Sequence, residues 1–299
     1  MTFLDLLHER FPALRVLPAE PLAKHTSFQI GGPAPMAFPD SPEVLTDLLA
    51  FCRAQGCQPM ILGAGTNVLA PDQGLDRLVI CTKSMSQLKD LGDGRIEAQC
   101  GVPLARLASF ARDLGLTGLE FAHGIPGSVG GGVYMNAGAY GGELCQVAEE
   151  TLALLPDGTL WEARGGDQGF AYRTSAFQQR QAVILRTRFR LTPGDPAAIT
   201  ARMQELAAKR RASQPLEKPS AGSTFKRPVG GYAAALIDQA GLKGKGVGQA
   251  AVSEKHAGFV VNLGGATAAD VLATMDLVAQ TVYEHSGIRL EPEVRIWQR

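Results

Sequence analysis

The sequence predicts a mixed fold of helices and strands, of the α/β or α+β class. Short runs of β-branched residues alternate along the chain with segments of helical periodicity. Glycine accounts for 35 of the 299 residues, about 12% against a usual ~7%, and the glycines gather in loops that follow predicted strands. With 45% hydrophobic residues the chain can form a substantial core, and its length favours two or more domains.

Capping residues and turn residues set the limits of the predicted elements. The expected helices run from Ser41-Pro42 to Gly56, over Pro103–Leu114, from Asp195 through Ile199, Met203 and Leu206, and from Thr267 to Gly287 with Asp270 as a capping-box partner. The expected strands are Pro59–Leu62, Leu78–Cys81, Ile96–Cys100, a hairpin over Thr151–Ala163 that turns at Asp157-Gly158, and Val183–Leu191. The sharpest change of composition, at residues 192–196, predicts a domain boundary.

Charge and cysteine content exclude several classes of protein. The chain has 29 basic and 29 acidic residues, which argues against a nucleic-acid or membrane-surface binder. Its five cysteines are scattered and lack Cys-x-x-Cys spacing, so we expect buried free thiols rather than disulfides or a zinc site. No signal peptide and no apolar run of about 20 residues is found. We therefore expect a soluble, cytoplasmic protein.

Two glycine-rich loops predict a binding site for a dinucleotide. Backbone N–H groups in such loops can converge on an anion because no Cβ blocks the approach. The residues expected to bind the cofactor are Gly63, Ala64, Gly65, Thr66 and Asn67 in the first loop, Gly124, Pro126, Gly127, Ser128, Gly130 and Gly131 in the second, and Gly138 just after it. The spacing matches neither a Rossmann fingerprint, a Walker loop nor a Gly-x-Ser-x-Gly elbow. One such loop alone could be a tight turn, but two favour a pyrophosphate cradle.

Three further segments carry residues that could do chemistry. They are Tyr172-Arg173, the stretch from Ser223 to Lys226 after Gly222, and Glu293 after a proline. Each has an ordinary interpretation when taken alone: a surface salt bridge, a capping serine or a solvated carboxylate. Lys226 and the next residue, Arg227, place two cations together in a neutral chain, which suits an anionic ligand.

The order of these motifs resembles that of the UDP-N-acetylenolpyruvoylglucosamine reductase (MurB) family. The resemblance runs from residue 24 to residue 295 and is to the shorter, second type of the family. It implies an α+β fold, with an FAD-binding domain of the vanillyl-alcohol-oxidase (PCMH) type made of two α/β subdomains, plus a substrate-binding α+β domain. The implied limits are 1–191 for the FAD-binding region (subdomains about 1–82 and 83–191), 192–287 for the substrate domain, and 288–299 for a strand that returns to the FAD region.

The resemblance also implies an activity. Such an enzyme uses NADPH and non-covalent FAD to reduce the enolpyruvyl ether of UDP-N-acetylglucosamine to UDP-N-acetylmuramate, a cytoplasmic step of peptidoglycan precursor synthesis. Arg173 would stabilise the developing enolate, Ser223 would protonate it, and Glu293 would act through a proton or an intervening hydrogen bond. Tyr172 and Lys226 match substrate-binding positions. The implied partners are small molecules only, with no metal, and the implied assembly is a monomer.

Some positions depart from the family pattern, and other functions stay open. Gln29 stands where an arginine is common, His123 where a small residue is typical, and Gln249 is displaced. The alternatives are an FAD-linked oxidase of the same superfamily and a nucleotide-sugar-binding protein without catalysis. Ser223 and Glu293 argue against the oxidase, and the presence of all three chemical residues argues against the binding protein.

Overall fold

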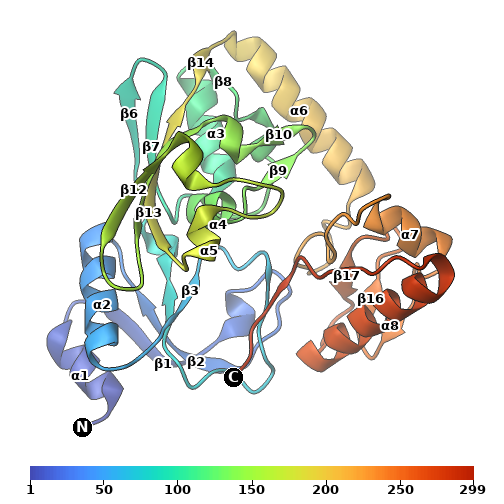
Figure 1. Cartoon of the computed structure of the whole chain (residues 1–299), viewed down its shortest axis with the longest axis horizontal. Coiled ribbons are helices and arrows are strands. Elements are labelled where there is room, and N and C mark those ends of the chain that lie inside the picture. Colours follow the sequence, from blue (N-terminus) through green and yellow to red (C-terminus); the bar gives the residue numbers. More distant parts are fainter. The chain divides into compact units, whose positions relative to one another are not determined.

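The computed structural model describes all 299 residues and divides them into two compact units (Figure 1). Unit 1 consists of Met1–Pro18, Met36–Ala64 and Arg77–Lys209. Unit 2 consists of Ala19–Pro35, Gly65–Asp76 and Arg210–Arg299. Each unit is therefore assembled from segments that are distant in the sequence. No helix of the structure combines the length and the apolar character needed to cross a membrane.

Eight α-helices form where the sequence supplies caps and an apolar face. They are α1 (Phe3–Arg10), α2 (Pro42–Ala54), α3 (Leu104–Asp113), α4 (Val129–Tyr134), α5 (Ala176–Gln179), α6 (Pro196–Ser213), α7 (Ala233–Gln239) and α8 (Ala268–Ser286). The Ser41 hydroxyl accepts from the third amide of α2, and Thr267 and Asp270 form the capping box of α8. The predicted limits of α2, α3 and α8 are confirmed to within two residues. Helix α1 was not predicted.

A four-stranded sheet has the order β1-β2-β5-β3. Its strands are β1 (Arg15–Pro21), β2 (Pro33–Phe38), β3 (Met60–Leu62) and β5 (Val79–Cys81). The pairs β2–β5 and β3–β5 are parallel, so α2 is the crossover that links β2 to β3. Strand β3, which follows this crossover, ends where the first glycine-rich loop begins.

A five-stranded antiparallel sheet in unit 1 has the order β12-β11-β13-β7-β6. Its strands are β6 (Leu88–Gly92), β7 (Arg95–Gln99), β11 (Ala148–Leu154), β12 (Leu160–Arg164) and β13 (Val183–Arg190). The predicted hairpin is confirmed as β11–β12, and the predicted strand Val183–Leu191 as β13. Helices α3 and α4 pack beside this sheet in Figure 1, and their leucines and valines share one core with its strands.

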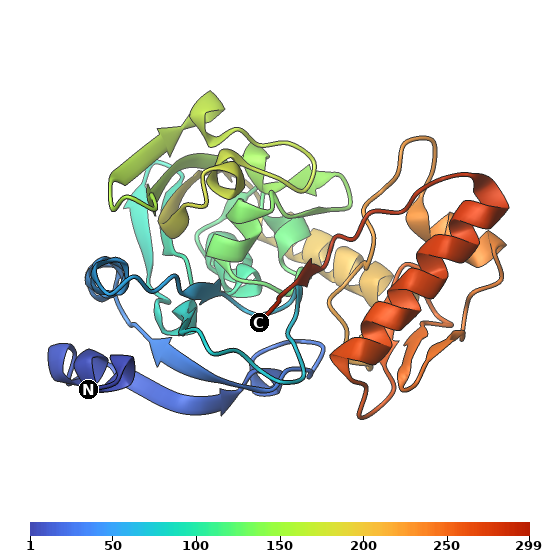
Figure 2. The same cartoon turned by 60° about the horizontal axis from the view of Figure 1, so that its bottom comes forward.

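Unit 2 has its own core beneath α8. The small sheet has the order β15-β16-β17, with strands β15 (Gly246–Val247), β16 (Ala250–Val252) and β17 (Val260–Asn262). Helix α8 packs along this sheet (Figure 2) and buries Val271, Met275, Val278 and Val282, as the sequence predicted. Phe28 and Leu69 lie in the same core, which explains why residues far from the C-terminal segment belong to unit 2.

The remaining strands form two-stranded pairs. They are β4 (Val68–Leu69) with β18 (Arg295–Ile296), β9 (Gly138–Ala139) with β10 (Gly142–Glu143), and β8 (Leu116–Thr117) with β14 (Thr192–Pro193). The β4–β18 pair is parallel and lies within unit 2. The C-terminal strand therefore pairs with residues of the expected FAD-binding region.

The division between the units lies at Lys209/Arg210, inside α6, whereas the sequence placed a domain boundary at residue 192. Asp195 does cap α6, because its carboxylate accepts from the amides of Ala197 and Ala198. The composition change therefore marks the beginning of a helix. The buried residues of that helix, Ile199, Met203 and Leu206, belong to the core of unit 1, so the first part of α6 is part of unit 1. The functions assigned to the predicted domains stay predictions.

Candidate active site

The beginning of the first predicted glycine-rich loop meets the second loop inside unit 1. Gly63 follows β3, and Ser128 immediately precedes α4. A Cβ added to Gly63 would lie 2.5 Å from the Ser128 hydroxyl oxygen, so only glycine allows this approach. Backbone hydrogen bonds hold the second loop, because the amides of Val129 and Gly130 donate to the carbonyls of Val102 and Cys100.

The Ser128 side chain is the unusual group in this loop. It is 2% exposed, and its hydroxyl has no hydrogen-bond partner. It precedes the first turn of α4 without capping it. A buried hydroxyl without a partner is costly in a folded protein, unless a ligand supplies the bond. The Ser128 hydroxyl, which lies next to Gly63, is therefore a suitable donor for a bound dinucleotide.

Arg173 is held in a strained turn of unit 1. Its φ is +56°, in the left-handed region that non-glycine residues seldom adopt. One guanidinium nitrogen donates to the Gly138 carbonyl at 3.1 Å, and the guanidinium carbon lies 5.1 Å from the centre of the Tyr172 ring. The structure thus brings together three of the predicted site residues, from two loops.

Asn136 ties these two loops together. It is 1% exposed and also left-handed, at φ +44°. Its amide nitrogen donates to the Ala171 carbonyl (3.1 Å) and to the Glu143 carboxylate (3.0 Å), and its oxygen accepts from the Cys145 amide (3.0 Å). Asn136 was not among the predicted site residues. The sequence does offer a signal for this residue, because an asparagine in a glycine-rich turn often adopts left-handed backbone.

In unit 2 the structure places the Ser223 segment beside the Glu293 segment. The Glu293 amide donates to the Thr224 carbonyl at 2.8 Å, and the Lys226 amide donates to the Glu291 carbonyl at 2.9 Å. Ser223 is exposed, whereas Thr224, the next residue, is 1% exposed. Two predicted segments that are far apart in the sequence, one with Ser223 and Lys226 and one with Glu293, are thus paired in this unit.

The first predicted loop is divided between the units. Gly63 and Ala64 belong to unit 1, and Gly65, Thr66 and Asn67 belong to unit 2. Gly65 has φ +72°, and a Cβ there would lie 2.0 Å from the His25 carbonyl oxygen. The Asn67 side chain donates to the Glu293 carbonyl at 3.1 Å. The structure therefore links this part of the loop to the C-terminal segment.

The positions that depart from the family pattern have ordinary places in the structure. Gln29 has φ +57° and its amide donates to the Thr26 carbonyl. His123 follows a short turn of 3₁₀ helix, and the Gln249 amide donates to the Asp270 carboxylate. The contacts of Gln29 and Gln249 are made by their backbone amides, so they do not depend on the side chain that is common in the family.

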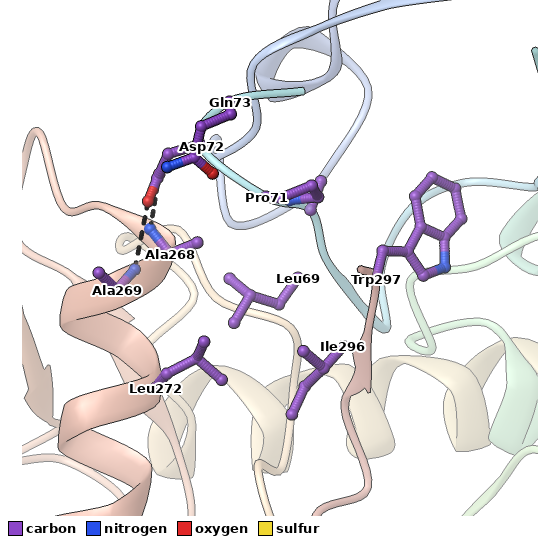
Figure 3. Close-up of a pocket in the computed structure, with 10 residues that line it drawn as sticks. Leu69, Pro71, Asp72, Gln73, Ala268, Ala269, Leu272, Ile296 and Trp297 are labelled. Atoms are coloured by element: carbon purple, nitrogen blue, oxygen red, sulfur yellow. Dashed lines mark hydrogen bonds between the residues drawn. The ribbon is translucent and has the colours of Figure 1, made fainter. Parts of the chain in front are cut away.

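A pocket of about 170 Å³ in unit 2 contains none of the predicted site residues. Its apolar lining includes Leu69, Leu272, Ile296 and Trp297 (Figure 3). The Asp72 carboxylate at its edge accepts from the first amides of α8, those of Ala268 (2.7 Å) and Ala269 (3.3 Å). Because Asp72 already uses these donors, the pocket offers them to no other anion.

The cysteines differ in exposure. Cys52, Cys81 and Cys100 are buried, and burial raises the pKa of Cys52 and of Cys100 to about 12. Cys145 is exposed, so the prediction of buried thiols is wrong for this residue, which lies in the surface turn tied by Asn136. No group of three or more His, Cys, Asp or Glu side chains is placed to hold a metal ion.

Two family models match the chain. Residues 33–164 match a model described as FAD binding domain, and residues 214–297 match one described as UDP-N-acetylenolpyruvoylglucosamine reductase, C-terminal domain. The loops that meet at Ser128 lie within the first match, and the Ser223 and Glu293 segments lie within the second.

Individual relatives agree with these matches. The chain is 43% identical to the UDP-N-acetylenolpyruvoylglucosamine reductase of Syntrophomonas wolfei, over 95% of this chain and 96% of that protein. It is 35% identical to the solved UDP-N-acetylenolpyruvylglucosamine reductase (MurB) of Thermus caldophilus, with a TM-score of 0.81, over 95% of this chain and all of that one.

A third likeness is one of fold alone. An alkyldihydroxyacetonephosphate synthase is 14% identical, with a TM-score of 0.50, over 64% of this chain and 41% of that chain. Together with the FAD binding domain match, it agrees with the predicted α+β fold and its FAD-binding domain of the vanillyl-alcohol-oxidase (PCMH) type. This chain belongs to the UDP-N-acetylenolpyruvoylglucosamine reductase family, as an oxidoreductase with an FAD-binding domain.

Proposed function

We propose that this chain reduces the enolpyruvyl ether of UDP-N-acetylglucosamine to UDP-N-acetylmuramate, with NADPH as the electron donor and FAD as the cofactor. The net reaction adds a hydride and a proton across the vinyl carbon–carbon bond and oxidises NADPH to NADP⁺. The observation that carries the proposal is the backbone pairing of the Ser223 and Glu293 segments. It brings the backbone of the serine segment next to that of the glutamate segment, and the proposal is that the two side chains act together in a protonation step.

Bound FAD would supply the hydride. We infer that the glycine-rich loops around Gly63 and Ser128 hold it. The support is the unpartnered Ser128 hydroxyl and the room left by Gly63, since a hydroxyl can donate to a pyrophosphate and a glycine lets the ligand approach the backbone. The binding is non-covalent in this proposal.

Arg173 is proposed to bind the carboxylate of the enolpyruvyl group. Hydride addition to the terminal carbon moves negative charge onto the adjacent carbon and this carboxylate. A guanidinium can meet both carboxylate oxygens at once, and it stays charged throughout. The hydrogen bond from the guanidinium to the Gly138 carbonyl would hold the side chain before substrate arrives, and such preorganised charge can stabilise a transition state.

Ser223 is proposed to deliver the proton. Its exposed hydroxyl is a poor acid in water, but an enolate carbon is basic enough to accept its proton. Glu293 would take part in its protonated form or through a hydrogen bond, because a bare carboxylate would repel the enolate. The proton that Ser223 loses then returns to it from solvent or from Glu293.

Tyr172 and Lys226 are proposed to bind the nucleotide part of the substrate. Lys226 now pairs with Glu291 at 3.2 Å, and both side chains are at least two-fifths exposed. An exposed pair of this kind contributes at most about 1 kcal/mol. A diphosphate, with more charge, can therefore displace Glu291 from the lysine.

The visible spectrum of the purified protein tests the proposal most directly. We expect a flavin spectrum that bleaches with NADPH and recovers when the enolpyruvyl sugar nucleotide is added. A protein that yields no flavin on denaturation would exclude the proposed function. Rapid oxygen consumption with an alcohol and without NADPH would indicate the oxidase instead.

Ser223→Ala tests the role of the serine. Bleaching by NADPH should persist, whereas recovery with the sugar nucleotide should slow by roughly 10²–10⁴-fold. Ser286→Ala is the matched control, because Ser286 lies in the same unit and bonds only within its own helix and the turn after it. Unchanged turnover of Ser223→Ala would remove the serine from the mechanism.

The cellular setting belongs to the same proposal. We propose a monomer that works in the cytoplasm, in peptidoglycan precursor synthesis, on the basis of the family resemblance. Size-exclusion chromatography with light scattering measures the first part, and cell fractionation measures the second.

A further inference from the structure

We propose that Asn67 is a positioning residue for Glu293, through the hydrogen bond from its side-chain amide to the Glu293 carbonyl. Asn67 was predicted to bind the cofactor, but its amide nitrogen donates to the C-terminal segment. The inference rests on the proposed function, because it gives Asn67 a part in the protonation step that Glu293 serves.

Both peptide groups of Glu293 are held, each by a different partner. Its amide donates to the Thr224 carbonyl at 2.8 Å, and its carbonyl accepts from the Asn67 amide at 3.1 Å. The Arg295 amide returns a bond to the Asn67 carbonyl at 2.9 Å. Asn67 thus bonds the chain both at Glu293 and two residues after it, where β18 begins its parallel pairing with β4.

Thr224, which binds the Glu293 amide, is itself held by two further hydrogen bonds. The Thr224 hydroxyl accepts from the Val260 amide at 2.9 Å, and the Thr224 amide donates to the Gly258 carbonyl at 2.8 Å. This anchor fixes the backbone next to Ser223. Asn67 holds the other side of the Glu293 backbone through its side-chain amide, so it restricts the movement of this residue relative to the serine segment.

Loss of the Asn67 bond should therefore move the acid rather than unfold the unit. The β4–β18 pairing uses backbone groups that a substitution at Asn67 leaves in place. A shift of about 1 Å in a catalytic group can reduce a rate by about 10²-fold. We expect the protonation step to slow while cofactor binding is preserved.

Two substitutions at Asn67 distinguish the loss of the hydrogen bond from the loss of side-chain volume. Asn67→Asp keeps the shape but replaces the donor by a carboxylate that repels the Glu293 carbonyl, and Asn67→Ala removes the side chain. Arg299→Ala is the matched control. Arg299 pairs with Asp76 at 2.8 Å, so it joins the same two segments at their far end, and both side chains are exposed.

The two half-reactions are measured separately by rapid mixing. For both Asn67 variants we expect recovery of the flavin absorbance with the sugar nucleotide to slow by roughly ten- to a hundredfold. Bleaching by NADPH and the affinity for FAD should stay within about twofold of the parent protein. A larger solvent isotope effect on the slowed step is expected, because proton transfer then limits it. Arg299→Ala should leave both half-reactions unchanged.

Hydrogen exchange on the flavin-free protein gives a readout that needs no cofactor. The amides of residues 293–297 should exchange faster in both Asn67 variants, with the rest of unit 2 unaffected. Weakened FAD binding with a normal second half-reaction would overturn the proposal and leave Asn67 as a cofactor ligand. Loss of the folded state in both variants would also overturn it, because the role would then be structural.

Glu293→Gln separates this inference from the proposed function. If that substitution leaves the second half-reaction unchanged, the role proposed for Glu293 is wrong. If it slows this half-reaction and the Asn67 variants do not, only the positioning role is wrong. If both are right, Asn67→Ala combined with Glu293→Gln should be little slower than Glu293→Gln alone.

Discussion

The two units hold their predicted site residues by different means. In unit 1 the residues lie on turns, where Asn136 and Arg173 adopt left-handed backbone and the Ser128 hydroxyl has no partner. In unit 2 Ser223 and Glu293 lie on extended segments joined by backbone hydrogen bonds. The difference suits two tasks: glycine-rich turns leave room around a large ligand, whereas backbone hydrogen bonds hold two chain segments in a constant register.

A methyl group at Gly65 should have the largest effect. Gly65→Ala would put a Cβ 2.0 Å from a backbone carbonyl, in a residue with φ +72°. We expect a loss of more than about 3 kcal/mol in the free energy of unfolding, measured by urea denaturation. Gly141→Ala is the control from unit 1, because Gly141 has φ +85° but open space around it, and should lose only about 1–2 kcal/mol. Equal losses would show that backbone strain alone, and not the crowding in unit 2, is decisive.

Replacement of Asn136 should break the turns of unit 1. Asn136→Ala removes three hydrogen bonds and keeps the left-handed strain, for an expected loss of about 2–3 kcal/mol. Asn136→Gly removes the same bonds but relieves the strain, so it should be more stable than the alanine variant by about 1 kcal/mol. Thermal melts of the two variants give the comparison. If both melt together, the backbone conformation contributes nothing.

Ser128→Ala should have opposite effects on the empty and the loaded protein. In the flavin-free protein it removes a buried hydroxyl that has no partner, so stability should stay the same or rise by up to about 1 kcal/mol. The affinity for FAD should fall by roughly tenfold or more, as expected for a lost bond to a charged group. Calorimetric titration of the flavin-free protein measures the affinity. An unchanged affinity would mean that the Ser128 hydroxyl does not bind the cofactor.

Acid should weaken unit 2 slightly through His256. Burial lowers the pKa of His256 below its ordinary 6.5, and its Nδ1 accepts from the Gly258 amide at 3.1 Å, which requires the neutral ring. The unfolded chain takes up the proton near pH 6.5, before the folded protein does, so stability should fall as the pH drops below about 6.5. Urea unfolding between about pH 5 and pH 8 should show this slope, and His256→Gln should reduce it. His285→Gln, at an exposed histidine of the same unit, should not.

Local signals in the sequence predicted much of the secondary structure. Ser41 predicted the beginning of α2, Thr267 with Asp270 predicted that of α8, and Asp157-Gly158 predicted the β11–β12 turn. Each of these signals acts within a few residues of the structure it specifies. The two units could not be predicted in this way. The burial of Phe28 and Leu69 in unit 2 depends on residues far along the chain, and nothing next to them in the sequence indicates it.

In the candidate site, too, local features could be predicted from the sequence and long-range contacts could not. Glycine content predicted the loops at Gly63 and Ser128, because missing side chains are visible in a sequence. The pairing of Glu293 with the residue after Ser223 is a long-range backbone contact, and only the family resemblance related these residues. The amide of Asn67 was assigned to the cofactor because its neighbours are glycines, whereas its partner lies near the C-terminus.

The β4–β18 pairing has a consequence for biosynthesis. Residues 295–296 are made long after residues 68–69, yet the two segments form one strand pair. A growing chain can bury most of unit 1 while Phe28 and Leu69 still wait for the core that the C-terminal segment provides. On a ribosome, these apolar side chains therefore lack their core until residues 221–294 have been made. We expect this interval to be when the nascent protein is most open to chaperones and proteases.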